Sequence, residues 1–218
     1  MKIFWRELFY GKGLWRAFLY DALPAAAVLL RFPLIDIACG KSPGYRRILG
    51  ISKEDVRVTT VDADSSANPS IVHDVARGPI PCPDGAFNTA LLMNCAYAFP
   101  DVPAVLADIH RILAPEGRLL ATFPLVFPYT PEPHDFCRFT EEGVRTLCRV
   151  AGFTDVSVRP LGGRWTAAAY LALPLARPHH LFAVPAYACA LLMDRLAASF
   201  FPSLPPAPIG YLVVAQRL

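Results

Sequence analysis

The chain has 218 residues, of which 54% are hydrophobic and 18% charged, and its formal net charge at pH 7 is +3. A chain of this length and composition can bury one sizeable hydrophobic core, which excludes an intrinsically disordered protein. The net charge is small and the lysines and arginines form no run, so we expect no nucleic-acid partner.

The first 31 residues predict two helices, interrupted near Gly11 and Gly13, with the second ending by Pro24 or Pro33. Charged residues interrupt the apolar pattern of this segment, which argues against a secretory signal. Because it is rich in aromatic and basic residues, we interpret residues 1–31 as a helical lid.

From residue 33 onwards, short apolar strands alternate with helices of about a dozen residues. Strands are predicted at 33–38, 56–62, 70–75, 88–94, 118–125, 153–160 and 209–218, and helices at 43–50, 102–113 and 140–152, the last with Thr140 as its N-cap. This alternation is typical of an open α/β fold with a mostly parallel sheet covered by helices on both faces. We therefore expect a core over residues 32–163, completed by a last strand at 209–218.

Residues 164–208 form an apolar insertion rich in Ala, Leu and Pro. The longest apolar runs of the chain, at 22–30, 167–176 and 181–193, are shorter than the ~18 residues of a membrane-spanning helix. We expect lid helices, with His179 and His180 in a solvated loop. The alternative is a surface that grips a lipid-bearing substrate or rests on a bilayer, together with the N-terminal segment.

The six cysteines are widely spaced and form no C-x-x-C pair. This pattern is typical of reduced thiols rather than of a disulfide framework, so we predict a cytoplasmic protein, with peripheral membrane contact as an extension of that prediction. His134 and Cys137 are not followed by a second ligand pair at metal-site spacing. We therefore predict no metal site.

Acidic residues stand at the ends of three predicted strands. Asp36 lies in the apolar strand that precedes a glycine-containing turn, Asp62 closes the second strand and Asp74 closes the third. In open α/β sheets, ligands bind at the carboxyl ends of the strands beside the first strand. Gly40 and Gly44 would let the backbone approach a ligand there.

The turn does not match the G-x-G-x-x-G pattern of dinucleotide-binding proteins, because it reads Asp36-x-Ala38-x-Gly40 and then Gly44. An acid before the turn would repel a diphosphate but suits an ammonium group. With an acid available for a ribose at Asp62, these residues favour S-adenosylmethionine over a nicotinamide cofactor.

Four segments, at 34–45, 58–66, 72–124 and 134–153, together resemble the successive motifs of class I S-adenosylmethionine-dependent methyltransferases. The chain is most similar to the small single-domain type with an H-D-x-x-R-F-T loop. The resemblance implies a Rossmann-like, seven-stranded, mostly parallel sheet with an antiparallel last strand. It also implies methyl transfer from S-adenosylmethionine to a small-molecule or lipid-linked acceptor.

Two departures from the family pattern keep another interpretation open. Ala38 replaces the usual first glycine, and Asn88 replaces an acid that commonly follows the position of Phe87. The alternative is a non-catalytic binding or scaffold protein that retains the methyltransferase fold.

The resemblance also implies which residues bind the cofactor. These are Asp36, Ala38, Cys39 and Gly40 around the methionine moiety, with Gly44 and Tyr45 beside them, Asp62 and Ala63 at the ribose, Asp74 and Val75 at the adenine, and Asn94 and Cys95 beneath the cofactor.

The loop that contains His134, Asp135 and Arg138 would lie over the methyl group of the cofactor. There His134 is a candidate general base, and all three residues are candidates for catalysis through contact with the acceptor. The competing interpretation is that Asp135 and Arg138 pair with each other and hold the loop.

Overall fold

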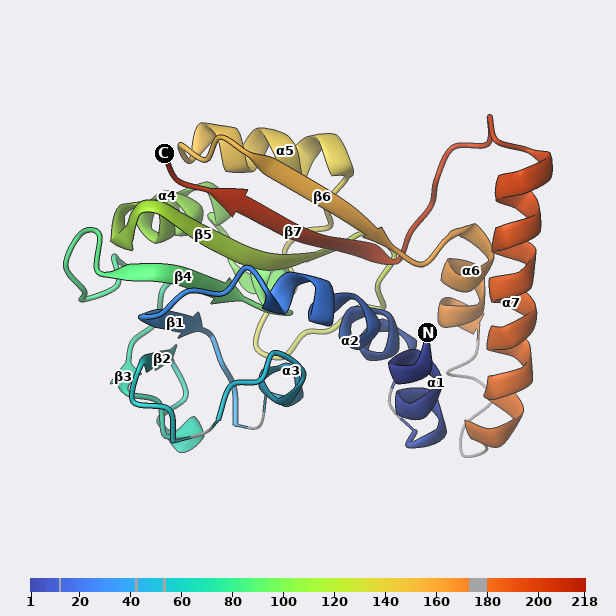
Figure 1. The fold of residues 1–218 in the computed structure, drawn as a ribbon, viewed down its shortest axis with the longest axis horizontal. Helices are drawn as coiled ribbons and strands as arrows, with labels where there is room; N and C mark the ends of the chain where they lie inside the picture. Colours follow the sequence, from blue (N-terminus) through green and yellow to red (C-terminus); the bar gives the residue numbers. More distant parts are fainter. Residues whose placement is uncertain (12, 42, 53, 173–179) are drawn as a thin grey trace.

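The computed structural model describes residues 1–11, 13–41, 43–52, 54–172 and 180–218 (Figure 1). Its strands form one seven-stranded sheet in the order β3-β2-β1-β4-β5-β7-β6. The strands are β1 (Leu34–Ile37), β2 (Val58–Asp62), β3 (Ile71–Val72), β4 (Phe87–Leu92), β5 (Leu113–Pro124), β6 (Val156–Leu161) and β7 (Gly210–Gln216). Strands β1 to β5 are parallel, and β7 is antiparallel to both β5 and β6. The predicted Rossmann-like α/β fold is confirmed.

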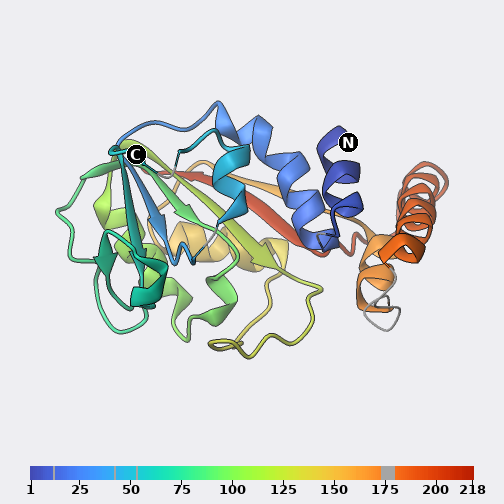
Figure 2. The same ribbon diagram turned by 90° about the horizontal axis from the view of Figure 1, so that it is seen from below.

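Helices cover both faces of this sheet (Figure 2). They are α1 (Lys2–Phe9), α2 (Leu14–Ala27), α3 (Gly44–Ile48), α4 (Val102–Ile112), α5 (Glu141–Val150), α6 (Arg164–Ala172) and α7 (His180–Phe200), with short 3-10 turns η1 (Ser65–Ala67) and η2 (Ala96–Ala98). The N-terminus of α5 is capped as predicted, because the Thr140 hydroxyl accepts a hydrogen bond from the backbone N–H of Gly143.

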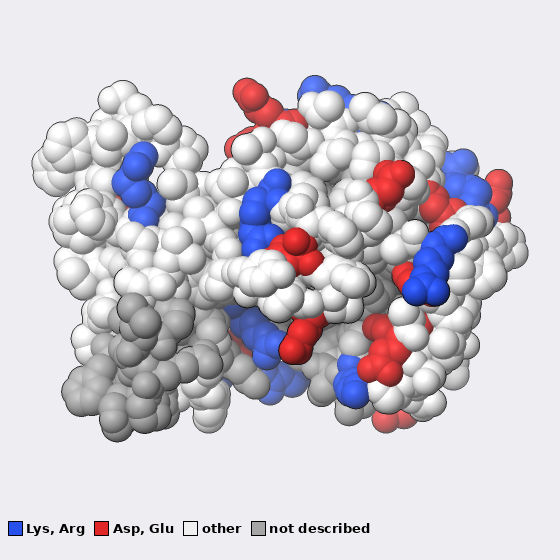
Figure 3. Space-filling model, turned by 180° about the vertical axis from the view of Figure 1, so that it is seen from behind, with Lys and Arg blue, Asp and Glu red and all other residues white. Residues whose placement is uncertain are grey.

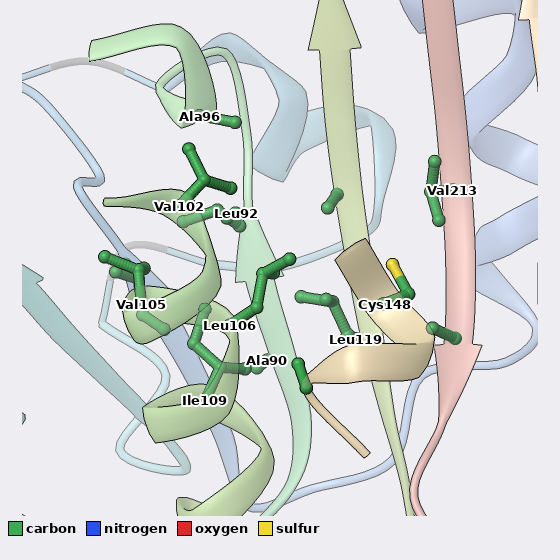
Figure 4. Packing of buried hydrophobic residues seen from close by; sticks show 14 of the residues in the cluster. Ala90, Leu92, Ala96, Val102, Val105, Leu106, Ile109, Leu119, Cys148 and Val213 are labelled. Carbon is green, nitrogen blue, oxygen red and sulfur yellow. The ribbon is translucent and has the colours of Figure 1, made fainter. Parts of the chain in front are cut away.

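One face of the sheet is covered by α4 and α5 (Figure 4). The apolar stripe of α4, which includes Val105, Leu106 and Ile109, packs in the same buried cluster as Leu92 of β4 and Leu119 of β5. Because both sheet faces are covered, the middle strands are mostly hydrophobic, as is typical of parallel strands, with Asp36 in β1 and Asn88 and Thr89 in β4 as polar exceptions.

The other face is covered by α2 and α3, where Leu19 and Leu23 pack in one cluster with Leu91 of β4 and Leu120 of β5. Pro24 lies inside α2 and does not end it. The N-terminal segment therefore supplies part of the helical layer on the sheet, and a further role as a lid stays a prediction.

The insertion contains α6 and α7, which stand beside the end of the sheet near α1 (Figure 1). Asp194 of α7 accepts hydrogen bonds from the backbone N–H groups of Trp165 and Thr166 at 2.8 and 3.0 Å, and so caps the N-terminus of α6. His179, predicted in a loop, lies outside the described residues, whereas His180 begins α7 and is not in a loop.

The expectation that no apolar segment reaches membrane-spanning length is wrong for α7. The helix runs on through Asp194 and Arg195 to 21 residues, because the residues around these two charges are apolar. Its segment Ala183–Phe200 is long and apolar enough, by length and composition alone, to cross a membrane, and 6% of that segment is buried.

Candidate functional site

A cavity of about 510 Å³ opens at the carboxyl ends of β1, β2 and β4. It has the size of a small-molecule site. Eight of the predicted site residues line it, namely Ala38, Asp62, Ala63, Asp74, Val75, Asn94, Cys95 and His134. The topology thus brings together residues that are almost 100 positions apart in the chain.

The turn after β1 bends sharply toward β2. Ala38 and Gly40 both have left-handed backbone conformations, with φ of 52° and 65°. The N–H of Gly40 donates a hydrogen bond of 2.7 Å to Asp62 Oδ2, and the N–H of Asp64 donates one of 2.9 Å to Asp62 Oδ1. These two bonds fix the orientation of the carboxylate at the cavity. Each of its oxygens keeps a second lone pair, so Asp62 can still accept two hydroxyl groups.

Ala38 carries backbone strain that a glycine at this position would avoid. We expect Ala38→Gly to raise the free energy of unfolding by about 1 kcal/mol, because a Cβ disfavours the left-handed conformation by more than glycine loses in chain entropy. Ala107→Gly, at an exposed position inside α4, should instead lower the free energy of unfolding by about 1 kcal/mol, because glycine is a poor helix former. Urea unfolding measures both, and equal destabilisation by the two substitutions would exclude strain at Ala38.

Asp36 and Tyr45 do not line this cavity. Asp36 is fully buried, and its two carboxylate oxygens accept a hydrogen bond of 2.8 Å from the Tyr45 hydroxyl and one of 2.6 Å from Arg46 Nε. Burial raises the pKa of Asp36, and Arg46 and Tyr45 act in the opposite direction. The ammonium partner expected for Asp36 is therefore replaced by a guanidinium of the chain itself.

Gly44 has a structural role that the sequence did not indicate, and its contact with the cofactor stays a prediction. A Cβ at this position would lie 2.5 Å from the Tyr20 hydroxyl oxygen, so glycine is needed for the approach of α2. Together with Cys39 and Gly40, Gly44 lines a second cavity of about 870 Å³.

Asn94 makes hydrogen bonds to two neighbouring elements, β5 and α2. Its backbone has φ of 59°, its N–H donates to Thr122 Oγ1 at 2.7 Å, and its side-chain oxygen accepts a hydrogen bond of 2.6 Å from Trp15 Nε1. Helix α2 therefore reaches the edge of the cavity through Trp15. The sequence did not indicate this contact, because the two residues are 79 positions apart.

Cys95, which lines this cavity, and Cys39, which lines the second one, do not have lowered thiol pKa values. Burial raises the pKa of Cys39 to about 11 and that of Cys95 further still, and the nearby Asp36 carboxylate acts in the same direction. A raised pKa favours the protonated thiol, so neither cysteine has the features of a thiolate nucleophile.

The three predicted catalytic residues separate into two groups. His134 is exposed at the rim of the cavity. Asp135 and Arg138 form an ion pair instead of facing the cavity, and the guanidinium also donates to the carbonyl groups of Phe127 and Pro128. Hydrogen bonding to Arg138 lowers the pKa of Asp135. This pair holds the loop against the end of β5, as the competing interpretation proposed.

An aromatic row that the sequence analysis did not identify leads away from the cavity. Tyr97, which lines the cavity, lies 5.8 Å from the ring of Phe127, and Phe127 lies 5.6 Å from Trp15 and 6.0 Å from Tyr170 of α6. Arg138 lies over the rings of Tyr97 and Phe127. In the sequence, the aromatic residues that follow β4 could have indicated Tyr97. No local pattern indicated the other rings of this row.

Comparisons with known proteins agree with this geometry. Residues 35–121 match a family model described as a methyltransferase domain. A nocamycin O-methyltransferase of Saccharothrix syringae is 30% identical over 108 residues, which cover 44% of this chain and 39% of that protein. The match thus spans less than half of the curated relative.

Solved structures share the fold at low sequence identity. A methyltransferase from Archaeoglobus fulgidus, described as dependent on S-adenosylmethionine, has a TM-score of 0.59 at 13% identity, over 98% of this chain and 99% of that one. The [4+2]-cyclase SpnF has a TM-score of 0.57 at 19% identity, over 92% and 80%. Phosphoethanolamine N-methyltransferase 2 of Haemonchus contortus, in complex with S-adenosyl-L-methionine, has a TM-score of 0.55 at 13% identity, over 91% and 52%.

The cyclase shows that this fold also supports other reactions, so the structural likeness establishes architecture and not chemistry. The match at 35–121 covers less than half of the chain, and it includes the turn after β1, the end of β2 and the end of β4. Residues 35–121 are therefore similar to a methyltransferase domain, and the chain has the fold of solved S-adenosylmethionine-dependent methyltransferases.

Proposed function

We propose that the protein binds S-adenosylmethionine in the 510 Å³ cavity and transfers its methyl group to a lipid-linked small molecule. The observation that carries the proposal is Asp62, whose carboxylate is fixed by two backbone N–H groups at the cavity and keeps acceptor capacity for both ribose hydroxyls. Ala63, Asp74 and Val75 line the same cavity where the adenine would lie.

The other residues at the cavity suit a reaction whose rate depends mainly on how the acceptor and the methyl group are positioned. The bound cofactor supplies an electrophilic methyl group, and holding an acceptor in line with it in a water-poor site contributes most of the rate. Asn94, fixed by Trp15 and Thr122, holds the floor of the cavity. His134 at the rim is placed to accept the proton of an acceptor hydroxyl or amine.

Calorimetric titration with S-adenosylhomocysteine tests the cofactor assignment, and we expect a single saturable site. A protein that is folded by circular dichroism but gives no heat and no thermal shift would overturn the proposal. Saturable binding without methyl transfer to any acceptor in a membrane-lipid extract would instead support the scaffold alternative.

The apolar insertion supports the lipid-linked acceptor and a contact with the bilayer. Leu192, Leu196 and Phe200 of α7 are 55%, 41% and 72% exposed. Asp194, a charge in the middle of the helix, is used to cap α6. In the view of Figure 3, the α6–α7 end carries far less charge than the core. The aromatic row from Tyr97 to Tyr170 links this end to the cavity.

We therefore expect the protein to float with phosphatidylcholine vesicles that contain phosphatidylglycerol. Each exposed apolar side chain contributes roughly 1.5–3 kcal/mol when it enters lipid, so a variant with Leu192→Glu, Leu196→Glu and Phe200→Glu should lose most of the floating fraction. Val150→Glu, at a 73% exposed position on α5, is the matched control and should float normally. Failure of the unmodified protein to float would exclude the bilayer contact.

A further inference from the structure

A second cavity, of about 870 Å³, lies beside the turn that follows β1. It is bordered by α2, by α3 and by the segment after β2. Its charged lining is unbalanced, because four cationic side chains face one carboxylate: Arg16, Lys41, Arg46 and Arg47 against Glu7.

Two of these cations pair with carboxylates outside the lining, Arg46 with Asp36 at 2.6 Å and Lys41 with Asp64 at 3.5 Å. Glu7 is only 2% exposed and already pairs with Arg6 at 2.9 Å, while its distance to Arg47 is 3.4 Å. Arg16 is exposed and has no ion-pair partner among the residues described by the structure. The excess of positive charge at the cavity therefore comes from Arg16 and Arg47, because Glu7, the carboxylate of the lining, is already paired with Arg6.

Arg46 adds a donor that the fold leaves unused. Its Nε atom donates to Asp36, but its Nη2 atom is buried and has no hydrogen-bond partner. Across the described ranges it is the one buried side-chain nitrogen or oxygen atom without a partner. A buried unsatisfied donor is unfavourable, so an acceptor from outside the chain would be stabilised here.

We propose that this cavity binds a phosphate-bearing ligand at a site separate from the cofactor cavity. Guanidinium groups match the geometry and charge of phosphate oxygens, and the hydroxyl-bearing residues Tyr20, Thr60 and Ser70 line the same space. Several cations in one cavity suit a group with more than one negative charge better than they suit a single carboxylate. The proposal concerns binding alone and does not depend on methyl transfer.

Calorimetric titration of inorganic pyrophosphate into protein saturated with S-adenosylhomocysteine tests this site. We expect saturable binding that weakens about 10-fold in Arg16→Gln, because one charge-assisted contact is lost. Arg46→Lys keeps a cation beside Asp36 but lacks the Nη atoms, so it should weaken binding similarly. Arg149→Gln, at an exposed position on α5 on the opposite face of the sheet, should bind as the unmodified protein does. Thermal unfolding checks that each variant is folded.

Two results would overturn the proposal. One is the absence of pyrophosphate binding to the folded protein. The other is competition of pyrophosphate with S-adenosylhomocysteine but not with methylthioadenosine, which lacks the amino-acid end. That pattern would mean that the cations of this cavity bind the carboxylate at the amino-acid end of the cofactor and not a separate phosphate-bearing ligand. If the protein does not bind S-adenosylhomocysteine, the same titration into the free protein still decides on the phosphate site.

Discussion

Replacing Arg46 by methionine is expected to lower the free energy of unfolding by about 3–5 kcal/mol, because it leaves a buried carboxylate without its cation. Asp36 is completely inaccessible to solvent and Arg46 is 11% exposed, so water cannot replace the lost partner. The hydrogen bond from Tyr45 remains but supplies no charge. Since domains are stable by only about 5–15 kcal/mol, urea unfolding followed by tryptophan fluorescence should show a large shift of the midpoint.

Two further variants separate the ion pair from other effects of the substitution. Arg47→Met changes the next residue of α3, whose side chain is 70% exposed, and should alter stability by less than about 1 kcal/mol. In Arg46→Met with Asp36→Leu both charges are gone, so much of the lost stability should return. A double variant no more stable than Arg46→Met alone would show that the cost arises from packing and not from the unpaired charge.

The sheet and the helices on its α4 side were predictable because their signals are local. The stripe of Val105, Leu106 and Ile109 repeats with the helical period, and the strands at 34–37 and 87–92 are short apolar runs. Asp62 ends β2 and Asp74 lies two residues beyond the end of β3, and the parallel register of β1, β2, β3 and β4 brings these strand ends together. Sequence reasoning therefore located the cavity and eight of the residues that line it.

The function of Asp36 was not predictable in the same way. An acid in an apolar strand before a glycine turn is expected both for a ligand-binding acid and for a buried ion pair. The choice depends on Arg46, which approaches only after α3 has packed against the end of β1. Likewise, the role of Gly44 in the packing of α2 becomes visible only when the position of Tyr20 is known.

Long-range contacts explain the other differences. The hydrogen bond between Trp15 and Asn94 and the capping of α6 by Asp194 join segments that no local pattern relates. The capping role also explains how α7 tolerates an acid in an apolar helix, which made the helix look interrupted in the sequence. What the sequence lacks is the identity of each polar group's partner, and that partner decides whether a charge is structural or free to bind a ligand.

Asp62 is a carboxylate whose partners leave it free to bind, and Asp62→Asn is expected to weaken the binding of S-adenosylhomocysteine by about 100-fold. Hydrogen bonds to a charged acceptor contribute roughly 1.5–3 kcal/mol each, and the asparagine keeps the shape but turns one oxygen into a donor. The N–H of Gly40 and a ribose hydroxyl then compete for a single oxygen. Asp64→Asn, two residues along, is the matched control, because its exposed carboxylate accepts from Ser66. Calorimetric titration of S-adenosylhomocysteine into both variants distinguishes the role of Asp62 from that of Asp64, provided that thermal unfolding shows the two variants to be equally stable. Equal loss in the two would mean that the negative charge of the loop, and not contact with the ribose, determines affinity.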